Sequence, residues 1–181
     1  MRVEKLSRLS LFRNVPQESL ERLLKVCLFT RYFITDQVFV QGSAANQALL
    51  LVEGRLEVSV KGSGTHHHVG IIYPGEVVGE QALFVSGGRC NASVFANQAS
   101  VCLILSPELF QSNNNDPAIA ALERHLIATL TRRIRKTNLE IQKAWKASRV
   151  AVESAPQRSA PQRSAPPTFR ERLKLLFGGR F

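Results

Sequence analysis

The sequence predicts a mainly β fold with flanking helices: an antiparallel β-roll, of the double-stranded β-helix or jelly-roll kind, followed by a long C-terminal helix. Between Thr30 and Leu105, short alternating or apolar runs are separated by turn signals such as Glu53-Gly54 and Pro74-Gly75. Six or more short strands at such regular spacing are typical of a closed or double-layered antiparallel structure. Helical periodicity precedes this section and returns after it, which predicts helices on both sides of the roll.

Two short helices are expected before the β section. Apolar residues lie three and four positions apart between residues 6 and 27, and Pro16, followed by Gln17 and Glu18, interrupts them. Because proline is favoured in the first turn of a helix, the second helix is expected to begin near Pro16.

The β section is expected to hold six or more strands, with glycine-containing turns between them. The predicted strands are Phe33–Val40, Ala48–Val52, Arg55–Val60, His68–Ile72, Ser93–Phe95 and Val101–Leu105. The run His66, His67 and His68 is expected to lie on a hairpin surface rather than bind a metal, because consecutive residues of a strand point to opposite faces.

A long helix is expected from about Pro117 to about Val152. Its apolar stripe comprises Ile119, Leu122, Leu126, Leu130, Ile134, Ile141, Trp145 and Ser148. Over its first turns the stripe can pack on the roll; beyond Ile134 self-association is an alternative, so residues 119–150 are a candidate homodimer interface. His125 is expected to be an ordinary surface residue of this helix.

The C-terminal part differs in composition from the rest. A five-residue unit rich in Pro, Ala and Ser repeats within residues 153–167 and predicts an extended, unfolded linker. In residues 168–181, Phe169, Leu173, Leu176 and Phe177 share one helical face with basic flanks, which predicts a short basic amphipathic helix. The expected organisation is therefore residues 1–116 as a roll with N-terminal helices, 117–152 as the long helix, 153–167 as a linker and 168–181 as a terminal helix.

The excess positive charge lies near the C-terminus. Residues 1–130 hold 11 basic and 11 acidic residues, whereas residues 131–181 hold 13 basic and 3 acidic ones, which accounts for the net charge of +10. Such a tail can bind nucleic acid, an anionic membrane or an acidic protein surface, and charge alone does not choose among them.

The cysteines and the apolar segments indicate the compartment. Cys27, Cys90 and Cys102 are an odd number without short spacing, which argues against a disulfide frame or a zinc site and favours a reducing environment. The N-terminus does not have the pattern of a signal peptide, and no apolar stretch approaches the length of a membrane span. A cytoplasmic protein is expected, with the alternative of peripheral attachment to a membrane or a larger assembly.

Three segments occur in an order and spacing that are together fairly specific. They are LFRNVPQESLERLL (11–24), VEGRLEVSV (52–60) and YPGEVVGEQALFVSGGRCNASV (73–94, called the cassette below). Residues 6–135 thereby resemble a cyclic-nucleotide-binding domain, the family of the catabolite activator protein, the regulatory subunits of protein kinase A and nucleotide-gated channels. The resemblance implies a regulatory module that binds cAMP or cGMP, without a metal, and passes the signal on through its C-terminal helix and tail. In family members the long helix closes over the nucleotide, so binding could shift its position.

The cassette has residues suited to a cyclic phosphate, which needs backbone amides and a cation. A short helix beginning at Gly79 would direct the amides near Glu80, Gln81 and Ala82 towards phosphate oxygens. The resemblance implies that Glu80 accepts the ribose 2′-hydroxyl and that Arg89 contacts the phosphate.

The residues at the end of the cassette can be aligned with the family pattern in two ways, which we call the two registers. Ala92 and Ser93 would continue it with an amide and a hydroxyl. Arg89 lies ten residues after Gly79, as the family's arginine often does, but Cys90 occupies the position four before Val94 where that arginine usually stands. If an extra residue follows the arginine, Arg89 binds the phosphate; if the preceding loop carries the insertion, Cys90 stands there and binding is weak or absent.

The sequence gives less support for an enzyme or a DNA-binding transcription factor. We find no paired-carboxylate arrangement, nucleophile elbow or Walker-type sequence, so an enzyme is not expected. Transcription factors of the family carry a helix-turn-helix domain after the long helix, whereas this chain has the repeat linker and a short tail, so sequence-specific DNA binding is not expected. The alternative is a ligand-free β-roll scaffold whose residues 168–181 dock onto a protein assembly or an anionic membrane.

Overall fold

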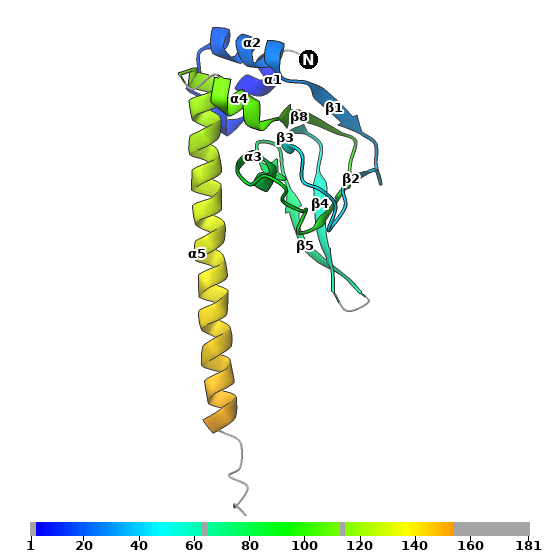
Figure 1. Ribbon diagram of the computed structural model, residues 1–181, viewed down its shortest axis with the longest axis vertical. Coiled ribbons are helices and arrows are strands. Elements are labelled where there is room, and N and C mark those ends of the chain that lie inside the picture. Colours follow the sequence, from blue (N-terminus) through cyan, green and yellow to red (C-terminus); the bar gives the residue numbers. More distant parts are fainter. Residues whose placement is uncertain (1–2, 63–64, 113–114, 154–181) are drawn as a thin grey trace, which may run out of the picture. The chain divides into compact units, whose positions relative to one another are not determined.

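Two four-stranded antiparallel sheets form the β part of the chain (Figure 1). The computed structural model describes residues 3–62, 65–112 and 115–153. The first sheet has the order β1 (Phe29–Tyr32), β8 (Ser100–Leu105), β3 (Ala48–Glu53) and β6 (Val77–Val78). The second has the order β2 (Gln37–Phe39), β7 (Ser93–Ala96), β4 (Leu56–Lys61) and β5 (His66–Ile72). The antiparallel β-roll predicted from the sequence is confirmed.

Strand β3 connects the two apolar cores of the domain. Leu49 and Leu51 belong to the core shared with β7 and β4, whereas Ala48, Leu50 and Val52 belong to the core shared with the helices. All five of these side chains are buried. Because successive strand residues point to opposite faces, a strand covered on both sides reads as a continuous apolar run, as ALLLV does here.

The helices gather on the outer face of the first sheet. They are α1 (Val3–Ser7), the 3₁₀ turn η1 (Ser10–Phe12), α2 (Gln17–Val26), α4 (Pro107–Ser112) and the first turns of α5 (Pro117–Glu153). Phe12 and Leu20 are at most 1% exposed and pack in one cluster with Ile119 and Leu122 of α5. Helix α2 follows Pro16 directly, as expected.

Asp116 fixes the start of α5. Its Oδ1 accepts a hydrogen bond of 2.9 Å from the Ala118 amide, and its Oδ2 accepts one of 2.8 Å from Arg22 Nε. The Ser19 hydroxyl also donates to this carboxylate. Desolvation would raise the pKa of Asp116, but the hydrogen bonds from Ser19, Arg22 and Ala118 outweigh it and lower that pKa. The carboxylate thus caps α5 and ties it to α2.

One predicted strand is wrong. Of the predicted strand Phe33–Val40, only Gln37–Phe39 is a strand, because a turn after β1 precedes it. Asp36 closes this turn by accepting a 2.7 Å hydrogen bond from the Phe33 amide, and Thr35 adopts a positive φ of 72°. Strands β1 and β6 and helix α4 were not predicted.

The chain divides into two compact units, residues 1–134 and 135–181. In the second unit the structure describes the helical residues 135–153. Nearly all of the predicted linker, 153–167, and all of the predicted terminal helix, 168–181, lie outside the described residues, so both stay predictions. None of the described helices combines the length and apolar character that a membrane span requires.

Candidate functional site

The cassette is held close to the roll at Gly79, between β6 and the short helix α3 (Gln81–Phe84). Gly79 has a φ of +73°, and a Cβ atom built there would lie 2.9 Å from the Gln47 carbonyl oxygen and 3.0 Å from the Phe39 ring. Residues with a side chain are disfavoured by both the conformation and the space. The glycine therefore sets how near α3 lies to β2.

Helix α3 is a single turn whose later amides are used internally. The Ala82 amide donates to the Gly79 carbonyl at 3.0 Å, and the Leu83 amide donates to the Glu80 carbonyl at 3.1 Å. Ala82 is buried and Gln81 is exposed. Of the three amides expected to face a phosphate, that of Ala82 is thus engaged in the turn, which leaves those of Glu80 and Gln81 as the candidates.

Glu80 is paired with an arginine from α5. Arg133 Nη1 donates to Glu80 Oε1 at 2.6 Å, with side-chain exposures of 45% for Arg133 and 15% for Glu80. Arg133 was not predicted as a site residue, because it is one of several basic residues in RRIRK and no local pattern marks it. The carboxylate expected to receive a ribose hydroxyl is therefore occupied by a charge-assisted hydrogen bond within the protein.

Arg89 and Cys90 pair with the turn after β2. Arg89 is exposed, and its Nη1 donates to the Gly42 carbonyl at 2.6 Å. The half-buried Cys90 donates its amide to the Ser43 carbonyl at 2.9 Å and accepts the Gly42 amide at 2.7 Å. The Arg89 guanidinium thus interacts with a neutral carbonyl in a solvent-exposed loop.

Ser93 and Ala92 lie at the start of β7. The Ser93 hydroxyl, 6% exposed, accepts a 3.0 Å hydrogen bond from the Gln41 amide. Ala92 is half-buried immediately before the strand. The Ser93 hydroxyl therefore stabilises the chain after β2, close to the loop that Arg89 contacts.

Two other cysteines lie inside the domain. Burial raises the pKa of the Cys27 thiol to about 11 and that of the Cys102 thiol to about 12, so both stay protonated at neutral pH. Within the described ranges, no three His, Cys, Asp or Glu side chains come together in a way that could hold a metal ion.

Residues 34–112, which include the whole cassette, match the family model described as cyclic nucleotide-binding domain. This segment belongs to the cyclic nucleotide-binding domain family. The chain is also 27% identical over 148 residues to cGMP-dependent protein kinase 2 of Mus musculus and of Rattus norvegicus. These alignments cover 77% of this chain but only 19% of either kinase, so the chain spans about a fifth of the length of the curated relatives it matches.

Two solved structures have the same fold. The catabolite activator protein of Thermus thermophilus superposes with a TM-score of 0.64 at 25% identity, over 74% of this chain and 62% of that one. The N-terminal domain of a transcriptional regulator from Streptomyces coelicolor A3(2) superposes with a TM-score of 0.56 at 26% identity, over 76% of this chain and 96% of that one. The family match of residues 34–112 and the superposition on these two structures therefore indicate the same fold.

Proposed function

We propose that this chain is a non-enzymatic regulatory module that binds cAMP or cGMP at the cassette and transmits binding through α5. The family of residues 34–112 supports cyclic nucleotide sensing. The observation that carries the proposal further is the bond between Glu80 of the cassette and Arg133 of α5. This bond joins Glu80, which the resemblance implies to bind the ribose, to α5, the helix that we propose transmits nucleotide binding.

Ligand and helix would compete for the same carboxylate. A ribose hydroxyl that bonds to Glu80 takes the acceptor that Arg133 now uses, so α5 loses one of its ties to the cassette. Because Arg133 is about half exposed, this ion pair is worth only about 0.5–1 kcal/mol. Its loss would therefore shift the equilibrium between helix positions by a factor of roughly two to five.

Arg89 would exchange its partner on binding. Its present acceptor, the Gly42 carbonyl, is neutral and accepts one bond from Nη1, whereas a phosphate is charged and can accept two parallel bonds from a guanidinium. A cyclic phosphate within reach would therefore compete favourably for the guanidinium. In the alternative register the Cys90 side chain stands at the phosphate, and an arginine at that position should strengthen binding.

Isothermal titration with cAMP and with cGMP tests the proposal on the full chain. If Arg89 binds the phosphate, Arg89→Ala should weaken binding at least about 100-fold, whereas Cys90→Ser should stay within about threefold. Cys90→Arg tests the second register, since only there would it tighten binding. No measurable binding of either nucleotide to the wild-type chain would overturn the proposal.

We also propose that α5 mediates homodimerisation. Ile127, Ile134 and Ile141 follow one another at seven-residue intervals and are 66%, 61% and 42% exposed. Trp145, in the same helix, is 70% exposed. Isoleucine repeated every seventh residue suits the a positions of a parallel two-stranded coiled coil. In sedimentation experiments Ile134→Asn should shift the chain towards monomer, whereas Arg135→Gln should not; equal masses for wild type and Ile134→Asn would contradict the dimer interface.

One observation favours the second candidate, a ligand-free scaffold that docks through residues 168–181. The two charged cassette side chains that are implied to contact the nucleotide, Glu80 and Arg89, already have partners within the protein. On this proposal the chain is a cytoplasmic adaptor, and deleting residues 168–181 would abolish its recruitment to a protein assembly or an anionic membrane without affecting the roll. Flotation with anionic liposomes distinguishes a membrane partner from a protein partner. If the chain does not float with the liposomes, the protein assembly is the remaining candidate.

A further inference from the structure

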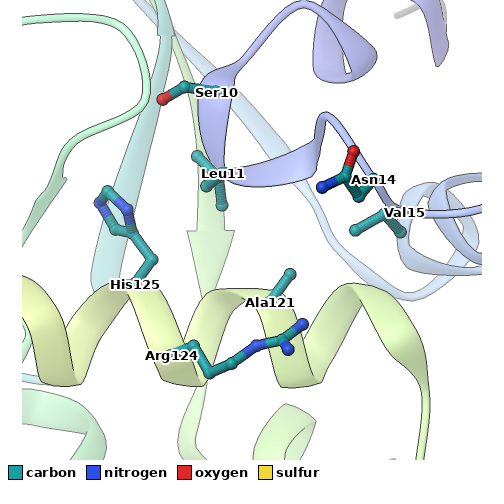
Figure 2. Close-up of a pocket in the computed structure, with 7 residues that line it drawn as sticks. All are labelled: Ser10, Leu11, Asn14, Val15, Ala121, Arg124 and His125. Carbon is teal, nitrogen blue, oxygen red and sulfur yellow. The ribbon is translucent and has the colours of Figure 1, made fainter.

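A second pocket, separate from the cassette, opens between the N-terminal segment and α5 (Figure 2). Its volume is about 500 Å³, within the range of small-molecule sites. No cassette residue lines it. The lining residues are Ser10, Leu11, Asn14, Val15, Ala121, Arg124 and His125.

The charge of the lining favours an anion. Arg124 brings a permanent positive charge, and none of the lining residues is acidic. Arg124 Nε donates to the Ala120 carbonyl at 3.2 Å, which holds the side chain along α5 and leaves the terminal nitrogens for a ligand. Figure 2 shows the guanidinium extending along the helix on the side of the pocket formed by Asn14 and Val15.

His125 contributes a neutral polar group. The sequence predicted an ordinary surface residue, but the ring is half-buried and lines the pocket. Burial lowers the pKa of His125, the nearby Arg132 lowers it further, and Glu76 acts in the opposite direction. Near neutral pH the imidazole is therefore mostly uncharged and can donate one hydrogen bond and accept another.

The remaining lining residues complete an amphipathic surface. Within the described part of the chain, the Ser10 hydroxyl and the Asn14 amide form no side-chain hydrogen bond to another residue, so both are available to a ligand. Leu11, Val15 and the buried Ala121 supply apolar contact between these polar groups. Small-molecule sites commonly combine an apolar surface with a few polar groups that fix the orientation of the ligand.

We propose that this pocket binds a small organic carboxylate with a short apolar or aromatic body. The carboxylate pairs with Arg124, the body packs against Leu11 and Val15, and the ligand bridges the N-terminal segment and α5. The site uses neither Glu80 nor Arg89, so the proposal does not rest on cyclic nucleotide binding.

Titration of ¹⁵N-labelled full-length protein with benzoate tests this site, with benzamide as the neutral molecule of matching shape. Arg124→Gln is the test variant. Arg135→Gln is the control for the loss of one positive charge on α5, because Arg135 is exposed and does not line the pocket. All titrations are made at equal ionic strength, so that salt screens the surface charges equally in each of them.

Benzoate should cause saturable shifts at amides of residues 10–15 and 121–125. Arg124→Gln should weaken this binding about tenfold, and Arg135→Gln should change it less than about twofold. Equal binding of benzamide, equal losses in the two arginine variants, or shifts that do not saturate would each overturn the proposal.

Discussion

Arg133 of α5 donates a 2.6 Å hydrogen bond to the Glu80 carboxylate of the cassette, 53 residues earlier in the chain. Since Glu80 is only 15% exposed, its carboxylate has limited access to water and depends on this partner. The long helix and the ligand cassette are thereby coupled through one acceptor group. The coupling is weak enough for a ligand to break, because Arg133 remains 45% exposed.

Replacing Arg133 should improve nucleotide binding. In Arg133→Gln the ligand no longer competes with a cation for Glu80, so affinity for the preferred cyclic nucleotide should rise about two- to fivefold. Calorimetric titration measures the change, and Arg132→Gln controls for the loss of one positive charge on α5. Weaker binding in Arg133→Gln alone would mean that Arg133 contacts the ligand instead of competing with it.

Gly79 and Gly87 provide a matched pair for backbone geometry. Both have a positive φ, of 73° and 71°, but a Cβ atom at Gly87 would meet nothing within 4 Å. Gly87→Ala should therefore lower the free energy of unfolding by about 1 kcal/mol through strain alone. Gly79→Ala adds the clash with Gln47 and Phe39 and should cost about 2–4 kcal/mol in urea denaturation. Equal losses of unfolding free energy in the two variants would show that the close approach of Gly79 to Gln47 and Phe39 does not contribute to stability.

The Asp116 cap predicts a loss of stability in acid. Because hydrogen bonds hold the pKa of folded Asp116 below its ordinary value of 3.8, the unfolded chain binds the proton more tightly. The stabilisation is thus complete above the unfolded pKa and disappears as the pH falls through the folded one. Asp116→Asn should show a smaller fall in unfolding free energy than wild type between about pH 5 and pH 2. Arg22→Gln should partly reduce the pH dependence of the unfolding free energy. If Asp116→Asn has the same pH dependence as wild type, the cap is not its source.

The sequence predicts those parts of the fold that local chemistry determines. Pro16 and Pro117 mark the starts of α2 and α5, and the run ALLLV marks a strand buried on both faces. The break between β1 and β2 was missed because it depends on one side chain, Asp36, closing a turn inside an apolar run.

The site could be predicted less completely than the fold. Gly79 is recognisable because turns with a positive φ favour glycine. The pairing of Glu80 with Arg133 could not be predicted, since it depends on which side of α5 reaches the cassette, and the sequence does not contain that information locally. The partners of Arg89 and Cys90 depend likewise on the turn at residues 42–44, which is distant in the sequence.

The most direct test of the account is amide hydrogen exchange of α5 with and without saturating cyclic nucleotide, on wild type and on Glu80→Gln. If the ligand displaces Arg133 from Glu80, exchange in the turns around Arg133 should become faster in wild type when the nucleotide binds. Glu80→Gln, which lacks the ion pair, should show the faster exchange without ligand. Unchanged or slower exchange across residues 119–150 of the nucleotide-bound wild type would contradict transmission through the release of this helix.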